Sequence, residues 1–224
     1  MDPLDKQAAI DRYNARLQEF GVSSAALGWG HTGKQVLRFA VLAREALERP
    51  NCSVLDIGCG FGDLYAFLTN RGWKGRYTGI DINPTLLGKA RERFAGATFL
   101  EADVMQNPDA VPAHDFVIMS GVFNHRMKSG DTAKHVLALL TAATAKARYC
   151  TCADFLSTWV DFQNPDGWHT DPAWALSVGR GISRRLALRA DYMPYEFSLF
   201  LYRDAEIDAN RVFTEYSARA VDAI

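Results

Sequence analysis

Short runs of apolar residues alternate along the middle of this chain with longer segments in which apolar residues recur every three or four positions. The runs predict buried strands, and the longer segments predict helices with one apolar face. We expect strands over 53–57, 76–81, 97–101, 115–120 and 148–156, with intervening helices over 63–70, 84–94 and 131–147. This alternation predicts a parallel sheet covered by helices on both faces.

The two ends of the chain depart from the alternation. Apolar spacing predicts an amphipathic helix over 7–20, with Tyr13 on its apolar face, and a second helix over about 34–48. After the fifth strand we expect a short helix at Asp171-Pro172, two β-like runs at 185–189 and 197–202, and a helix over 204–224. These segments come before and after the predicted α/β core in the sequence.

The first predicted strand leads into one acid and three alternating glycines, Asp56-x-Gly58-x-Gly60-x-Gly62. Glycine reaches backbone angles that other residues avoid, so such a turn brings the main chain close to a ligand. A dinucleotide fingerprint places its third glycine elsewhere, and Asp63 follows here. A phosphate-binding P-loop ends in Gly-Lys-Ser/Thr, which does not occur. The turn predicts a ligand site that fits neither of these classes.

A second acid, Asp81, ends the next predicted strand, about twenty residues beyond the glycine turn. In doubly wound folds an acid at this spacing binds ribose hydroxyls. The alternative is a helix cap, but Asn83 before Pro84 already supplies that signal. We therefore expect Asp81 to bind a ribose.

Two later strands complete a pattern that resembles the class I S-adenosylmethionine-dependent methyltransferases. Residues 54–62 and 80–81 are similar to that family's first two motifs, 99–103 to the strand whose acid meets the adenine amine, and 115–121 to the strand beside the methionine part of the cofactor. The resemblance implies an α/β, Rossmann-like fold with a seven-stranded, mostly parallel sheet, an antiparallel C-terminal hairpin and helices on both faces. It also implies S-adenosylmethionine as the cofactor.

The same resemblance implies which residues bind that cofactor. Gly58 and Gly60 are expected to face the sulfonium and ribose, Asp103 the adenine amine, and Ile82 and Val104 the purine. The complete expected set is Asp56, Gly58, Cys59, Gly60, Gly62, Asp63, Asp81, Ile82, Asp103, Val104, Ser120, Gly121, Arg38 and Trp29.

Arg38 enters that set through a narrower likeness. Segments 28–30, 35–39, 155–162 and 191–197 are similar to a bacterial subgroup of small-molecule methyltransferases. The likeness implies that Arg38 binds the methionyl carboxylate of the cofactor through two parallel hydrogen bonds, since a planar guanidinium matches a planar carboxylate. A solvated charge on a helix is the alternative.

Asn124 and His125 follow the fourth predicted strand and are the expected catalytic residues. A sulfonium methyl group is already activated, so its transfer needs mainly an aligned nucleophile. His125 is the expected proton acceptor, because an imidazole exchanges protons near neutral pH. A loop histidine exposed to solvent is the alternative.

Aromatic and polar residues gather late in the chain, in a segment over 157–196 that we expect to form a substrate lid. Core packing is the alternative for large aromatics, and we prefer it for Trp174 and Phe197. The expected substrate-binding residues are Trp159, Asp161, Phe162, His169, Tyr192, Tyr195 and Glu196.

Length, composition and charge limit the domain number and the binding partners that we expect. The 224 residues, 48% hydrophobic and 23% charged, suit a single domain over 1–224, in which we expect 1–50 to be a helical cap. The 25 basic and 26 acidic residues give a net charge of −1, which disfavours nucleic acid. No apolar stretch is long enough to cross a bilayer and the start lacks a signal-peptide pattern, so we expect a cytoplasmic monomer or homodimer that does not bind membranes.

The remaining chemistry is sparse. The four cysteines lack paired spacing, which predicts free and mostly buried thiols. No carboxylate cluster follows the fourth strand, so we expect no metal. The predicted function is methyl transfer from S-adenosylmethionine to an O, N or S atom of a small metabolite. A protein or RNA acceptor and a non-catalytic cofactor-binding module are the alternatives.

Overall fold

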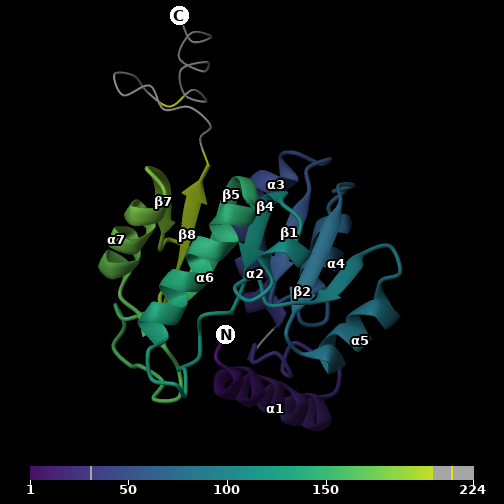
Figure 1. Ribbon diagram of the computed structural model, residues 1–224, viewed down its shortest axis with the longest axis horizontal. Helices are drawn as coiled ribbons and strands as arrows, with labels where there is room; N and C mark the ends of the chain where they lie inside the picture. The colour runs from purple at the N-terminus through teal and green to yellow at the C-terminus, as the bar shows by residue number, and fades with distance from the viewer. Residues whose placement is uncertain (31, 204–212, 214–224) are drawn as a thin grey trace, which may run out of the picture.

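The computed structural model describes residues 1–30, 32–203 and 213. Figure 1 shows a sheet between layers of helices. The sheet order is β3-β2-β1-β4-β5-β8-β7, and the two-residue strand β6 pairs with β5. The strands are β1 (Val54–Ile57), β2 (Tyr77–Asp81), β3 (Thr98–Glu101), β4 (His114–Met119), β5 (Ala147–Ser157), β6 (His169–Thr170), β7 (Arg185–Arg189) and β8 (Glu196–Tyr202).

Strands β1 to β5 run parallel, and β8 lies antiparallel between β5 and β7. The predicted seven-stranded sheet with an antiparallel hairpin is therefore confirmed, and β6 adds an eighth strand that the sequence did not predict. The strand order reverses between β1 and β4, and such a reversal opens a crevice at the carboxyl ends of the strands. The glycine turn follows β1 at that crevice.

The helices begin where side chains satisfy their first N–H groups. Asn83 accepts hydrogen bonds from Thr85 and Leu86, and Asp171 accepts them from Ala173 and Trp174. The helices are α1 (Pro3–Phe20), α2 (Thr32–Leu42), α3 (Arg44–Leu47), α4 (Asp63–Thr69), α5 (Pro84–Arg93), α6 (Thr132–Lys146) and α7 (Pro172–Ile182), with a 3-10 turn at Pro108–Ala110.

Two helix predictions differ from the structure, and a third falls outside the described residues. The segment expected as one helix over 34–48 forms α2 and α3, separated at Ala43. The helix expected to be short at Asp171-Pro172 continues to Ile182, where Gly179 lies close against β8 and lets the helix approach the sheet. The helix expected over 204–224 lies outside the described residues, apart from residue 213.

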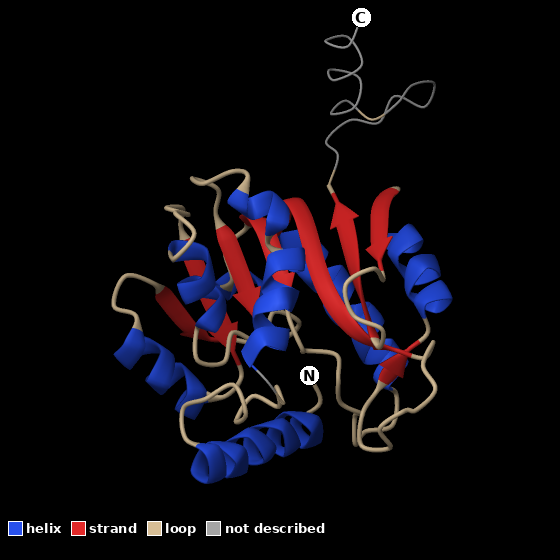
Figure 2. Ribbon diagram, turned by 180° about the vertical axis from the view of Figure 1, so that it is seen from behind, coloured by secondary structure: helices blue, strands red, loops and turns tan. Residues whose placement is uncertain are grey.

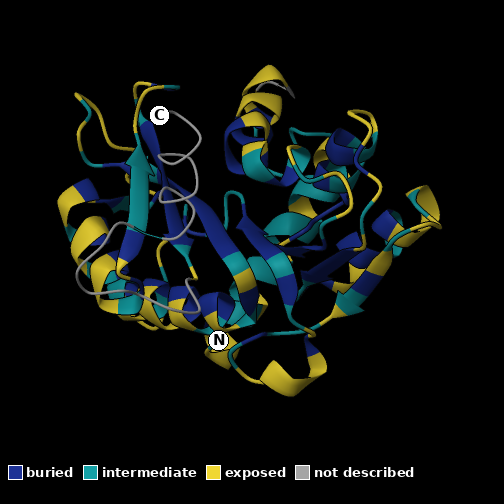
Figure 3. Cartoon of the chain, turned by 90° about the horizontal axis from the view of Figure 1, so that it is seen from above, coloured by how far each residue is buried: buried dark blue, intermediate teal, exposed yellow. Residues whose placement is uncertain are grey.

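Two apolar cores lie on opposite faces of the sheet, because successive strand residues point to opposite sides. Val54 joins the core under α2, α3 and α4, whereas Leu55 joins the core under α6 and α7. Figure 3 shows the strands mostly buried between these helical layers. All four cysteines are free and three of them are buried, as predicted. Among the described residues, no helix is long and apolar enough to span a membrane.

Candidate functional site

The glycine turn after β1 is shaped by three left-handed backbone positions. Gly58, Gly60 and Gly62 have φ values of 75°, 53° and 76°, which residues with a Cβ rarely adopt. The main-chain N–H groups of Gly58 and Cys59 donate to the carbonyl of Ile80 at 2.8 and 3.1 Å, which fixes the turn against β2. The turn therefore presents backbone, not side chains, to the crevice.

Two carboxylates lie beside this turn, Asp56 buried and Asp81 half-buried. Asp81 accepts hydrogen bonds from the N–H groups of Gly60 and Asn83, both at 2.9 Å, and each oxygen keeps a second lone pair for a ligand hydroxyl. Asp56 accepts a hydrogen bond from the hydroxyl of Tyr77 at 2.5 Å. Burial raises the pKa of Asp56 to about 7, although this hydrogen bond opposes the rise. Both acids are held in place before any ligand binds.

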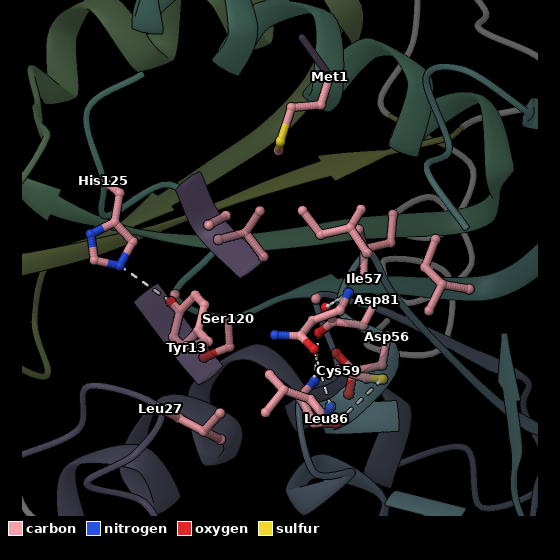
Figure 4. Close-up of a pocket in the computed structure, with 18 of the residues that line it drawn as sticks. Met1, Tyr13, Leu27, Asp56, Ile57, Cys59, Asp81, Leu86, Ser120 and His125 are labelled. Carbon is pink, nitrogen blue, oxygen red and sulfur yellow. Dashed lines mark hydrogen bonds between the residues drawn. The ribbon is translucent and has the colours of Figure 1, made fainter. Parts of the chain in front are cut away.

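A cavity runs along the carboxyl ends of β1, β2 and β4. Twelve of the fourteen expected cofactor residues line it, and Gly62 and Arg38 do not. Figure 4 shows Asp56, Asp81 and Cys59 grouped on one wall. The lining members are Trp29, Asp56, Gly58, Cys59, Gly60, Asp63, Asp81, Ile82, Asp103, Val104, Ser120 and Gly121.

Helix α1 covers the cavity. In Figure 1 and Figure 2 it lies below the strand ends, apart from the two helical layers. The amide of Asn83 donates to the side chain of Asn14 at 3.0 Å, which ties α1 to the end of β2. At the other side Asp5, which is 6% exposed, accepts hydrogen bonds from the N–H groups of Lys128 and Ser129 at 2.5 and 3.1 Å. The helix thus bridges the cavity from β2 to the loop after β4.

His125 lies in the cavity opposite α1. Its Nε2 is 3.2 Å from the hydroxyl of Tyr13, and the two side chains point toward one another in Figure 4. Burial, aided by the positive charges of Arg12 and Arg16, lowers the pKa of His125 to about 4. The imidazole is therefore neutral at neutral pH, and it is a weak base. Asn124 does not line the cavity, and its buried Oδ1 has no hydrogen-bond partner within the described residues.

Arg38 lies behind the cavity wall in a buried charge network. It is 4% exposed, and its Nε donates to Glu196 at 2.7 Å while a second guanidinium nitrogen contacts the other carboxylate oxygen. Its guanidinium also stacks over Trp29, 4.2 Å from the ring centre. Asp154 adds a second buried acid, which accepts hydrogen bonds from Ser120 and Gly121 at 2.7 and 2.6 Å.

This network corrects the expectation of a solvated Arg38. It also changes the expectation of a carboxylate fork, because Glu196 already occupies the two guanidinium nitrogens that would grip a ligand anion. The third nitrogen is buried without a partner among the described residues. In this structure Arg38 supports the Trp29 wall instead of lining the cavity.

Comparison with known proteins decides what kind of cavity this is. A family model described as "Methyltransferase domain" matches residues 54–145. The Mycobacterium tuberculosis protein named "Putative methyltransferase Rv1506c" is 34% identical over 154 residues, which are 66% of this chain and 92% of that protein. The chain belongs to the S-adenosylmethionine-dependent methyltransferases. S-adenosylmethionine is therefore its cofactor, and the glycine turn with its left-handed backbone and partnered acids suits that nucleoside.

Other methyltransferases share parts of the sequence or the fold. Trans-aconitate 2-methyltransferase of Escherichia coli K12 is 33% identical over 100 residues, which are 45% of this chain and 39% of that enzyme. The crystal structure of magnesium protoporphyrin IX methyltransferase from Synechocystis PCC 6803 with bound cofactor has a TM-score of 0.62 at 20% identity, and covers 89% of this chain and 97% of its own. The latter likeness concerns the fold alone.

The seven residues expected to bind substrate do not line the methyltransferase cavity. Trp159 and Phe162 are 61% and 77% exposed, and Glu196 is buried against Arg38. The segment over 157–196 is held beside the cavity, because the N–H of Trp168 donates to the carbonyl of Asn124 at 3.0 Å and β6 pairs with β5. Asp161, His169, Tyr192 and Tyr195 lie in the same segment.

Sequence reasoning missed the residues that α1 contributes. Asp5, Arg12 and Tyr13 all line the cavity, as does Arg126 in the loop after β4. The sequence predicted an apolar face on α1 that includes Tyr13, and the structure turns Tyr13 of this face toward the cavity. A polar hydroxyl in the middle of that face was the available signal, since a buried tyrosine hydroxyl usually needs a partner.

Proposed function

We propose that this methyltransferase acts on a small metabolite and transfers the methyl group to an O, N or S atom inside the cavity. The observation that carries the proposal is the position of α1. Hydrogen bonds to Asp5 and Asn14 hold the helix over the cavity, and this cover restricts the space that is left for an acceptor. A protein or RNA surface does not fit such a space without displacing α1.

We propose the following division of the cavity for the cofactor. Asp81 binds the ribose hydroxyls, Asp103 binds the adenine amine, and Ile82 with Val104 packs against the purine. The main chain of the glycine turn then lies beside the ribose and the sulfonium. These roles agree with the placement of the four side chains along one wall, at the ends of β2 and β3.

The activity of similar proteins supports a small acceptor. One relative, 33% identical over 100 residues, is named for trans-aconitate, which is a small acid. The cytoplasmic location and the monomeric or homodimeric state stay predictions from the sequence, as does the role of the 157–196 segment as a lid.

Methyl transfer to separated cell fractions tests the proposal. A cell extract is divided by ultrafiltration into small molecules and macromolecules, and each fraction is incubated with the enzyme and S-adenosylmethionine that carries tritium in its methyl group. We expect the label to enter the small-molecule fraction. Label found only on retained protein or RNA would contradict the proposal.

A further inference from the structure

We infer that the acceptor is a carboxylate, which Arg12 and Arg126 hold at the α1 side of the cavity. This inference rests on the proposed small-molecule methyl transfer and names its substrate class. It begins from the charges that face the cavity and from the partners that each of them has within the chain.

The two arginines line the cavity from different elements. Arg12 is a half-buried residue of α1, and Arg126 is an exposed residue of the loop after β4. Within residues 1–30 and 32–203, neither guanidinium has an ion pair or a side-chain hydrogen bond, and Arg126 only stacks over Trp168 with its carbon 5.4 Å from the ring centre. Two guanidinium groups are thus free to meet one anion.

The acids of the cavity show the opposite pattern, because each already accepts hydrogen bonds from the chain. Asp81 accepts them from main-chain N–H groups, Asp56 from Tyr77, and Asp63 from Gln35 together with an ion pair to Arg93 at 2.8 Å. Asp5 and Asp103 accept main-chain N–H groups of Lys128 and Met105 respectively. Among the described residues that line the cavity, the charged side chains without a hydrogen-bond or ion-pair partner are therefore Arg12 and Arg126.

The groups beside these arginines suit an acceptor that has no proton to lose. The two titratable neighbours are Tyr13 and His125, whose side chains contact each other. Burial raises the pKa of Tyr13, and the pKa of His125 is lowered to about 4, so neither group is a strong base at neutral pH. An alcohol would need such a base to become a good nucleophile, whereas a carboxylate arrives already ionised.

The transfer then balances without a proton acceptor. A carboxylate oxygen uses a lone pair to form a bond to the methyl carbon, while the bond between that carbon and sulfur breaks. The electron pair of the broken bond stays on sulfur, which loses its positive charge. The products are a methyl ester and S-adenosylhomocysteine, and no proton is released.

The chemistry of the product tests the inference. Tritiated product from the small-molecule fraction is treated with alkali, which hydrolyses methyl esters and releases volatile labelled methanol. We expect most of the label to become volatile. Label that stays non-volatile would overturn the carboxylate inference and leave the proposed function intact, whereas no label in that fraction would overturn both.

A charge-matched pair of variants tests the two arginines. Arg12→Gln/Arg126→Gln is compared with Arg44→Gln/Arg148→Gln, which removes two exposed positive charges away from the cavity. With the small-molecule fraction diluted in steps, the cavity variant should need about a hundredfold more of it for half-maximal rate, because each charged hydrogen bond is worth about tenfold or more. The control should match the wild type.

Calorimetry with S-adenosylhomocysteine separates the two possible anions, the acceptor's carboxylate and that of the cofactor. We expect the cavity variant to bind S-adenosylhomocysteine within about twofold of the wild type. A tenfold loss of that affinity with an unchanged dilution curve would overturn the inference, since the arginines would then bind the cofactor's carboxylate.

Discussion

Arg38 lies behind the Trp29 wall of the cavity that Arg12 lines, and the two arginines differ in which groups neutralise their charge. Arg38 is buried, and two nitrogens of its guanidinium donate hydrogen bonds to the carboxylate of Glu196. Arg12 is half-buried and has no anionic partner within the described part of the chain. Burial of a charge is tolerated only when a partner compensates for lost hydration. The first arginine therefore has a partner within the fold, and the second is available to a ligand.

The same difference distinguishes a structural pair of residues from a pair that is available to a ligand. Arg38 and Glu196 are 158 residues apart, yet both are needed to complete the wall behind Trp29. Arg12 on α1 and Arg126 in the loop after β4 line the same cavity, and neither has an ion pair or a side-chain hydrogen bond among the described residues. We expect substitutions in the first pair to change stability and substitutions in the second pair to change acceptor binding.

The largest effect is expected from Glu196→Ala. The substitution leaves Arg38 buried without its main partner, so the free energy of unfolding should fall by about 3 kcal/mol. Urea unfolding measures the loss. Glu48→Ala, which removes one partner of the exposed Arg44–Glu48 pair, is the control and should cost less than about 0.5 kcal/mol. A loss below about 1 kcal/mol for Glu196→Ala would show that the buried pair is not structural.

A smaller effect is expected from Asp5→Ala, which releases one end of α1. The N–H groups of Lys128 and Ser129 lose their acceptor, at a cost of about 2 kcal/mol. Hydrogen–deuterium exchange should show α1 amides opening about thirtyfold more often. Asp11→Ala, on the exposed side of the same helix, should leave exchange unchanged. Equal protection in both variants would mean that Asp5 does not anchor the helix.

His125→Gln is expected to change how stability depends on pH. The folded pKa of His125 is about 4, below its unfolded value, so between pH 4 and about 6.5 the unfolded chain binds more protons. Wild-type stability should therefore fall as the pH drops from 7 to 5, by about 2 kcal/mol more than that of the variant. Urea unfolding at pH 7 and pH 5 measures the difference. Parallel pH dependences would contradict the burial of His125.

The smallest effect on stability is expected from Arg12→Gln/Arg126→Gln. Because neither side chain has an ion pair or a side-chain hydrogen bond within the described part of the chain, the free energy of unfolding should change by less than about 0.5 kcal/mol. The same urea titration gives the value. A loss comparable to that of Glu196→Ala would remove the contrast between the paired and unpaired arginines.

Local pattern was enough to predict most of the fold and the cofactor wall. Apolar runs located β1, β2 and β3, and the acids at or just after these strands line one cavity because parallel strands share one carboxyl edge. The hairpin also followed from two adjacent β-like runs. By contrast, β6 has only two residues and depends on the pairing of its neighbours, so no periodicity marks it.

The acceptor side was not predictable in the same way. Whether the apolar stripe of α1 faces a core or a cavity depends on where the helix docks, and Asp5 and Asn14 determine this through contacts distant in sequence. The partner of Arg38 lies on β8, and local spacing carries no information about such a pair. Likeness to other proteins gave Arg38 a ligand role, but burial against Glu196 gives it a different environment.

Calorimetric titration of S-adenosylhomocysteine into the wild type and Asp81→Asn tests the division of the cavity most directly. The account predicts that the wild type binds and that Asp81→Asn binds about tenfold or more weakly, because hydrogen bonds to a charged group contribute about 1.5–3 kcal/mol. Asp191→Asn, an exposed acid of the hairpin loop, should bind as the wild type does. Equal affinities for the wild type and Asp81→Asn would contradict the assignment of this wall to the cofactor.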